Sequence, residues 1–265
     1  MHVSAGSPRL LAADSFRVRR NPRTDAPEAR GLELHLRRFT EAVLDAHGCS
    51  ATRTGGPAPD AQPIIDRVEA FLAEARTRIA AYGVGFPRLE LRDAENGGGP
   101  HELALALRPL PELRETITVR SAAEVRLPLP HRKGPAIARL SAVNRELGAE
   151  ALLLDASGQV LEGATTSLVW WPGRGGATGC AVPAGTLGSE RVDSVTERLL
   201  RAEAPLVDAR IRPEALLRCE VWAVNALHGI RVVTHVDDEP LPAPDAPRLR
   251  RFRDALDRTW QAIEK

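Results

Sequence analysis

The spacing of apolar side chains predicts two helices in the first third of the chain. One apolar stripe at roughly helical spacing runs through residues 31–48, where Gly48 suits a helix C-terminus. A second stripe runs through residues 63–82 and is ended by Gly83. The segment between them, residues 50–62, has no such stripe and is predicted to be a loop.

Alternating apolar and polar residues predict strands on both sides of these helices. The predicted strands are residues 10–18, 86–92, 102–108 and 116–120. The glycine-rich segment 96–100 and two later prolines separate them as turns. These strands and the two helices predict an N-terminal α/β domain spanning residues 1–122.

The second half of the chain begins after a segment with two prolines, residues 123–130, which is predicted to be an interdomain linker. The C-terminal domain is predicted to span residues 131–265. Its expected elements are a helix at 136–147, a strand-turn-strand unit at 150–171, a helix at 194–202, strands at 221–226 and 231–236, and a final amphipathic helix after the proline-rich loop 240–247.

Composition limits the classes of partner. The chain has 265 residues, 43% of them hydrophobic, and a formal net charge of +1. Near-neutrality gives no global reason to expect nucleic acid or a membrane surface as a partner. Cys49, Cys180 and Cys219 are scattered and lack metal-ligand spacing, so we expect free thiols, a cytoplasmic location and no metal site. No apolar run reaches membrane-spanning length.

The best clue to function is a lysine followed by a carboxylate. The chain has two lysines, Lys133 and Lys265. Downstream of Lys133, a strand-turn-strand run from Glu150 to Trp171 includes Glu162 at the end of an apolar strand. Pyridoxal phosphate chemistry needs a lysine that can hold the cofactor aldehyde as a Schiff base and a carboxylate that keeps the ring nitrogen protonated.

The run Leu154-Asp-Ala-Ser-Gly-Gln-Val-Leu-Glu-Gly163, with the small residues that follow it, resembles the class IV aminotransferases, which are fold-type IV pyridoxal phosphate enzymes. This family includes branched-chain and D-amino-acid aminotransferases and aminodeoxychorismate lyase. The resemblance implies an α+β, two-domain fold with a small N-terminal α/β domain and a larger C-terminal pseudo-barrel domain. It also implies pyridoxal 5'-phosphate as cofactor, bound between the domains, and a homodimer.

The resemblance assigns roles to several residues of the C-terminal half. Lys133 would be the catalytic lysine, and Glu162 would contact the pyridine nitrogen. Ser167, a predicted cofactor-binding residue that can still hydrogen-bond, stands where the family commonly has Asn, and Val182 stands where it commonly has Thr.

The resemblance also places the cofactor phosphate in this half of the chain. The family's phosphate cup, Gly-Ile/Val-Thr-Arg, matches Ser194-Val195-Thr196-Glu197, so Val195 and Thr196 would bind the phosphate. Ser194 and Glu197 are also spaced as a helix capping box. A competing register places residues 188–191 in the cup.

Two further matches complete the predicted site. His35-Leu-Arg-Arg38-Phe resembles the family's His-x-x-Arg helix motif, whose arginine reaches the phosphate, so Arg38 is a predicted cofactor ligand. Asn225 and Ala226 match a late strand and loop that lie beside the cofactor. The triplet Asn225-Ala-Leu227 is closer to the lyase than to branched-chain transaminases.

The function implied is a pyridoxal phosphate-dependent aminotransferase acting on a small amino acid or amine. Two alternatives stay open. One is aminodeoxychorismate lyase, which would form 4-aminobenzoate and pyruvate with the same residues. The other is a cofactor-free relative that kept the fold for binding, an idea suggested by the departures at Val182, Ser167 and Glu197.

Overall fold

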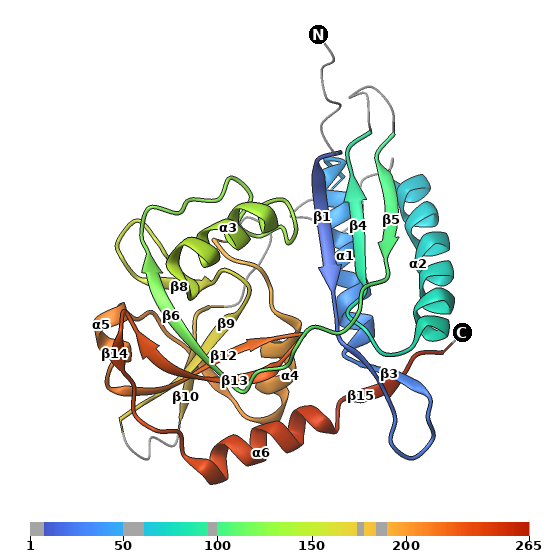
Figure 1. The fold of residues 1–265 in the computed structure, drawn as a ribbon. Helices are drawn as coiled ribbons and strands as arrows, with labels where there is room; N and C mark the ends of the chain where they lie inside the picture. The colour runs from blue at the N-terminus through green and yellow to red at the C-terminus, as the bar shows by residue number, and fades with distance from the viewer. Residues whose placement is uncertain (1–7, 50–60, 95–99, 174–177, 184–189, 265) are drawn as a thin grey trace. The chain divides into compact units, whose positions relative to one another are not determined.

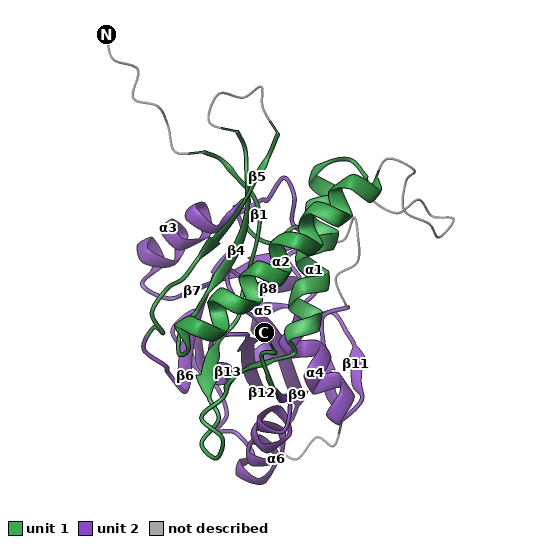
Figure 2. Cartoon of the chain, turned by 90° about the vertical axis from the view of Figure 1, so that its right-hand side faces the viewer, with its two compact units in different colours: residues 1–111, 132–135, 261–265 green, residues 112–131, 136–260 purple. Residues whose placement is uncertain are grey.

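The computed structural model of the chain describes residues 8–49, 61–94, 100–173, 178–183 and 190–264 (Figure 1). The predicted 50–62 loop and 96–100 turn fall largely outside these residues. The chain forms two compact units (Figure 2). Unit 1 takes in residues 1–111, 132–135 and 261–265, and unit 2 takes in residues 112–131 and 136–260.

Unit 1 is built on a three-stranded antiparallel sheet in the order β1-β4-β5. These strands are β1 (Leu10–Ser15), β4 (Arg88–Arg92) and β5 (Glu102–Ala106), and the helices are α1 (Leu32–Ala46) and α2 (Gln62–Tyr82). Helix α1 packs against β1, and α2 packs against α1 and β5. The apolar stripes that predict both helices are their buried faces, so these two helix predictions are confirmed.

The predicted strand at residues 10–18 is two strands in the structure. Strand β2 (Val18–Arg20) leaves β1 and forms a hairpin with β3 (Pro27–Arg30). Strand β15 (Trp260–Ala262) completes a second small sheet in the order β15-β3-β2, and Ile263 N donates to Pro27 O at 2.9 Å.

Unit 2 is built on one nine-stranded sheet, in the order β11-β10-β9-β12-β13-β6-β7-β8, with β14 paired to β13. Its strands are β6 (Thr116–Ala122), β7 (Glu150–Leu154), β8 (Val160–Gly163), β9 (Ser167–Pro172), β10 (Gly179–Ala181), β11 (Leu206–Asp208), β12 (Cys219–Asn225), β13 (Gly229–Val236) and β14 (Glu239–Pro240). Strand β6, a strand that the sequence predicts, lies parallel to β7 and β13 of this sheet. Local alternation predicts a strand but does not encode its partner.

Apolar side chains cover both faces of the large sheet. Leu168, Trp170 and Val221 belong to one apolar cluster, whereas Val169 and Trp222 belong to another, because neighbours along a strand point to opposite faces. The helices of unit 2 are α3 (Ile137–Leu147), α4 (Val195–Glu203), α5 (Pro213–Leu216) and α6 (Ala246–Asp257). The helices predicted before and after the strand-turn-strand unit, and the final amphipathic helix, are therefore present.

An aromatic cluster ties α6 to the sheet of unit 2. The Phe252 ring lies edge-on to the rings of Trp171 and Trp222, with ring centroids 5.5 Å and 5.3 Å away. All three side chains are almost completely buried. In the described part of the chain, no helix is both long and apolar enough to cross a membrane.

Candidate functional site

The segment that contains Lys133 is fixed to unit 1 by contacts on both sides. Lys133 O accepts a hydrogen bond from Ala13 N of β1 at 2.8 Å, and Arg132 Nε donates to Asp45 Oδ2 of α1 at 2.7 Å. Gly134 follows with φ of 118°, and a Cβ atom there would lie 2.4 Å from Ala13 N. Only glycine fits this close approach at that φ. The glycine after the lysine is therefore required by the packing of the segment on β1.

A buried carboxylate of unit 1 lies beside an arginine, a histidine and the predicted catalytic lysine. Asp14, in β1, is 1% exposed and accepts two hydrogen bonds from Arg38, from Nε at 2.7 Å and from Nη2 at 2.8 Å. His35 Nδ1 lies 2.8 Å from Asp14 Oδ1, and Lys133 Nζ lies 3.9 Å from the same oxygen. The structure thus brings Arg38 and Lys133 together around Asp14.

The electrostatics of this cluster favour an ionised Asp14 and disfavour the charged form of His35. Burial by itself would raise the pKa of Asp14, but its interactions with Arg38, His35 and Lys133 hold that pKa far below its ordinary value. Burial lowers the pKa of His35 below its ordinary value. Because an ionised carboxylate only accepts hydrogen bonds, His35 Nδ1–H donates to Asp14.

We expect Asp14→Asn to lower the free energy of unfolding by about 3 kcal/mol, because it leaves the Arg38 and Lys133 charges without their buried counter-charge. The folded-state pKa of Asp14 is lowered, so its stabilisation is fully present above its unfolded pKa and is lost as the pH falls through the folded value. Urea unfolding at several pH values should show a constant difference between wild type and variant from pH 8 to 5. The difference should shrink below about pH 4.

The matched control is Asp25→Asn. The Asp25 side chain is 80% exposed and pairs with Arg20 Nη1 at 3.0 Å, so its loss should change stability by less than about 0.5 kcal/mol. Equal effects of the two substitutions would show that Asp14 is not the counter-charge described here.

Glu162 and the turn after it form the second group of predicted residues, in unit 2. Glu162 lies in β8, is 7% exposed, and pairs with Leu153 of β7. Glu150 holds the following turn: it accepts hydrogen bonds from Thr165 N at 2.6 Å and Thr166 Oγ1 at 3.1 Å. A Cβ atom at Gly163 would lie 2.2 Å from Thr166 Oγ1. The small residues after Glu162 are thus needed for a tight turn closed by Glu150.

Asn225 closes a neighbouring turn of the same unit. Its Oδ1 accepts from Leu227 N at 3.1 Å and His228 N at 2.9 Å, and its Nδ2 donates to Thr165 O at 3.3 Å. The side-chain amide therefore shapes the turn between β12 and β13. Among the described residues, nothing accepts a hydrogen bond from the backbone N–H of Ala226.

The N-terminus of α4 has the features of an anion site. The predicted cap is confirmed, because Ser194 is the N-cap residue and its Oγ accepts from Glu197 N at 3.3 Å. The helix begins with Val195 and Thr196, which are 2% and 4% exposed. Within the part of the chain that the structure describes, their backbone N–H groups have no acceptor. Unsatisfied N–H groups and the helix dipole both attract an anion there.

Ser167 is linked to this helix by a buried arginine. Arg191 Nη1 lies 3.5 Å from Ser167 Oγ, and the same guanidinium makes two hydrogen bonds to Glu197. The competing register for the phosphate cup includes Gly188 and Ser189, which lie outside the described residues. Arg191, the arginine of that register, donates hydrogen bonds to oxygens of Val182, Pro183 and Glu197.

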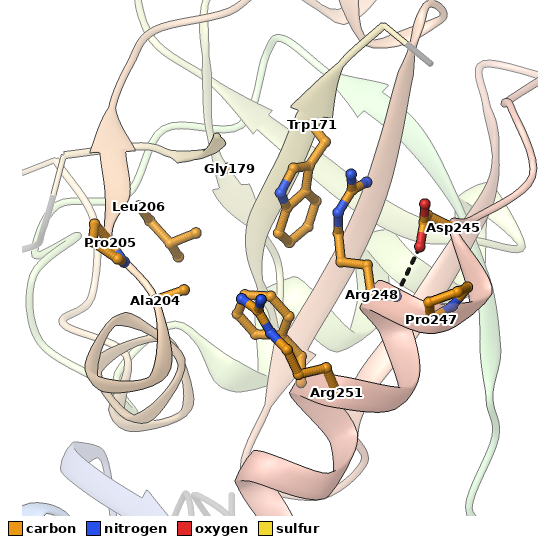
Figure 3. A pocket seen from close by; sticks show the side chains of 10 residues that line it. Trp171, Gly179, Ala204, Pro205, Leu206, Asp245, Pro247, Arg248 and Arg251 are labelled. Atoms are coloured by element: carbon orange, nitrogen blue, oxygen red, sulfur yellow. Dashed lines mark hydrogen bonds between the residues drawn. The ribbon is translucent and has the colours of Figure 1, made fainter. Parts of the chain in front are cut away.

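A separate hollow lies elsewhere in unit 2 (Figure 3). Its volume is about 390 Å³, and its lining is Trp171, Gly179, Ala204, Pro205, Leu206, Asp245, Pro247, Arg248, Arg251 and Phe252. Arg248 lies over the Trp171 ring at 5.1 Å from the centroid and forms an ion pair with Glu220. None of the predicted cofactor ligands lines this hollow, so it is distinct from the candidate site.

The sequence matches no protein-family model and no curated protein. Solved structures, by contrast, match almost the whole chain. A branched-chain amino acid aminotransferase from Escherichia coli is 14% identical, with a TM-score of 0.71, covering 96% of this chain and 90% of that one.

Two other structures match similarly. A hypothetical aminotransferase from Mycobacterium tuberculosis, with alpha-ketoglutarate and PMP bound, is 19% identical, with a TM-score of 0.67 over 94% of this chain and 88% of that one. A provisionally assigned 4-amino-4-deoxychorismate lyase from Legionella pneumophila is 14% identical, with a TM-score of 0.72 over 98% of this chain and 96% of that one. The predicted fold-type IV architecture is confirmed.

The structure divides the predicted ligands between the two units. Arg38 and Lys133 belong to unit 1, and Glu162, Ser167, Val195, Thr196, Asn225 and Ala226 belong to unit 2. Asp14 and Glu150 are supporting residues that the sequence did not indicate as part of the site, and Arg191 was considered only within the competing register for the phosphate cup. Asp14 left a signal, because a carboxylate within the apolar run of β1 needs a partner when it is buried.

Proposed function

We propose that this chain, which has the fold of the class IV aminotransferases, is a pyridoxal 5'-phosphate-dependent enzyme that transfers the amino group of a small amino acid or amine. The observation that supports the proposal best is the Asp14 cluster. The single lysine of the described residues is held on β1 beside a buried carboxylate that also fixes Arg38. An amine nucleophile and a guanidinium charge are thus gathered around one carboxylate.

The donors in the chain fit the cofactor's phosphate. Arg38 adds a positive charge, with its Nε and Nη2 donating to Asp14, and Val195 and Thr196 offer backbone N–H groups that no described residue uses. The unused N–H of Ala226 is a further donor among the described residues. Pyridoxal phosphate, when bound, supplies an aldehyde that condenses with amines and a ring that accepts the electrons of a broken Cα–H bond.

The protein groups then have separate tasks. We assign Lys133 to the cofactor aldehyde: its Nζ would be the amine that condenses with that aldehyde and would move the proton of the substrate Cα. The carboxylate of Glu162 keeps the proton on the ring nitrogen. Glu150 and Asn225 act indirectly, because they hold the two turns next to Glu162 and Ala226.

The second candidate function is an aminodeoxychorismate lyase. Two observations favour it: the triplet Asn225-Ala-Leu227, and the likeness to the Legionella structure over nearly the full length of both chains. The same lysine and carboxylate would serve both reactions, so the residues of the cluster do not discriminate between them. A cofactor-free relative is the third candidate.

A spectroscopic experiment separates the three. The purified protein is loaded with pyridoxal phosphate, mixed with one amino acid at a time, and followed by absorbance without a keto acid. As an aminotransferase, it should convert its cofactor to the pyridoxamine form once and then stop until a keto acid is added. With enzymatically made aminodeoxychorismate, it should release no 4-aminobenzoate.

Two other results would favour the alternative functions. Continuous release of 4-aminobenzoate and pyruvate without a keto acid would replace the aminotransferase by the lyase. A protein that takes up no cofactor at all would support the binding role.

We also propose a cytoplasmic homodimer, as the resemblance to the family implies. Cys49, Cys180 and Cys219 are free thiols, which fits a reducing compartment.

A further inference from the structure

A carboxylate lies in the first turn of the helix that we assign to the cofactor phosphate. Glu197 is the third residue of α4 and is 3% exposed. Uncompensated, its negative charge would oppose a phosphate at the N–H groups of Val195 and Thr196. The family's phosphate cup has arginine at this position, so the sign of the charge is reversed in this chain.

Arg191 compensates that charge. Its Nη1 and Nη2 donate to the two oxygens of Glu197 at 2.9 Å and 3.0 Å, and both side chains are 3% exposed. Further contacts fix the guanidinium: Nε donates to Pro183 O at 2.8 Å, Nη2 donates to Val182 O at 2.7 Å, and Nη1 lies 3.5 Å from both Ser167 Oγ and Val192 O. The charge of Arg191 is thus held in place by the backbone between β10 and α4.

The other charges around the start of α4 are balanced too. Arg201, one turn beyond Glu197, donates to Glu197 Oε1 at 2.9 Å and to Asp208 Oδ1 at 2.7 Å. Asp193, just before the helix, pairs with Arg198 at 3.1 Å. The two arginines Arg191 and Arg201 therefore match two carboxylates, Glu197 and Asp208, so that the helix dipole is not opposed by a net negative charge.

We infer that Arg191 is a positioning residue of the phosphate site, which neutralises Glu197 so that the N-terminus of α4 can receive a dianion. The inference rests on the proposed function. The inference also predicts that the summed charge of Arg191 and Glu197, rather than either side chain alone, sets the affinity of the α4 N-terminus for phosphate.

The test compares two ligands of the apoprotein. Pyridoxal 5'-phosphate and pyridoxal differ only in the phosphate, so the ratio of their dissociation constants, measured by absorbance titration, reports the phosphate contribution. Arg191→Met should weaken pyridoxal phosphate binding by about tenfold or more and change pyridoxal binding by less than about threefold. Adding Glu197→Gln to that variant should return the ratio to within about threefold of wild type.

The control variant is Arg258→Met. Arg258 Nη2 donates to Glu203 Oε2 at 3.1 Å, so this substitution removes the same charge at the other end of α4. It should leave the ratio unchanged. Thermal unfolding of every variant measures the structural cost separately.

The inference is overturned if Arg191→Met weakens both ligands equally, or if the double variant is no better than the single one. Should Arg191→Met fail to fold, Glu197→Gln alone decides: it should keep or increase the preference for phosphate, and a tenfold loss would overturn the inference. Wild-type apoprotein that binds neither compound would overturn the proposed function, and this inference with it.

Discussion

Replacing Lys133 by alanine should abolish turnover, with a loss of about 10⁴-fold or more, because no other described lysine can hold the cofactor aldehyde or move the Cα proton. Wild-type protein reduced with borohydride should retain a phosphopyridoxyl group that peptide mass spectrometry finds on Lys133. The variant should retain none.

A charge-conserving variant separates chemistry from electrostatics. Lys133→Arg keeps a cation near Asp14 but offers no amine that condenses with an aldehyde, so it should be as stable as wild type and inactive. Lys265→Ala should keep both the label and the activity. A label found on Lys265, or turnover in either Lys133 variant, would remove the basis of the proposed function.

Glu162→Gln should lower kcat by about 100-fold or more while changing cofactor affinity by less than about tenfold. The amide has the size of the carboxylate but cannot keep the ring nitrogen protonated while the substrate Cα proton is removed. Steady-state kinetics, together with titration of the apoprotein, measure the two quantities.

Glu112→Gln is the matched control for Glu162. The Glu112 side chain is 75% exposed, so the same chemical change there should leave kcat unaltered. If Glu162→Gln has a wild-type kcat, or if it mainly loses cofactor affinity, Glu162 does not have the role assigned to it.

The elements that could be predicted from the sequence are those determined locally. Helices α1 and α2 follow from apolar stripes that end at glycines, and the N-cap of α4 follows from the Ser194–Glu197 spacing. The parallel pairing of β6 could not be predicted in this way, because no local turn joins β6 to its partner strands β7 and β13.

The same distinction applies to the candidate site. Lys133 and Glu162 could be proposed because a motif surrounds each of them. The partners of Asp14 and Arg191 could not be predicted. Asp14 binds Arg38, which is 24 residues away in the sequence, and Arg191 makes a bidentate pair with Glu197. His35 and Arg38 are three residues apart on one helix face, and this spacing indicated that both side chains could contact the same acidic group, which is Asp14.

Residues 132–135 belong to unit 1, although the segments on both sides of them belong to unit 2, and this limits the design of fragments and chimeras of this protein. The polypeptide changes unit after residues 111, 131, 135 and 260, so no single cut separates the two units intact. A fragment ending at Pro111 keeps Asp14, His35 and Arg38 and loses the lysine. A chimera built by exchanging N-terminal halves between relatives would therefore join one parent's β1 to the other parent's lysine segment, and the glycine at position 134 must suit the β1 backbone it receives.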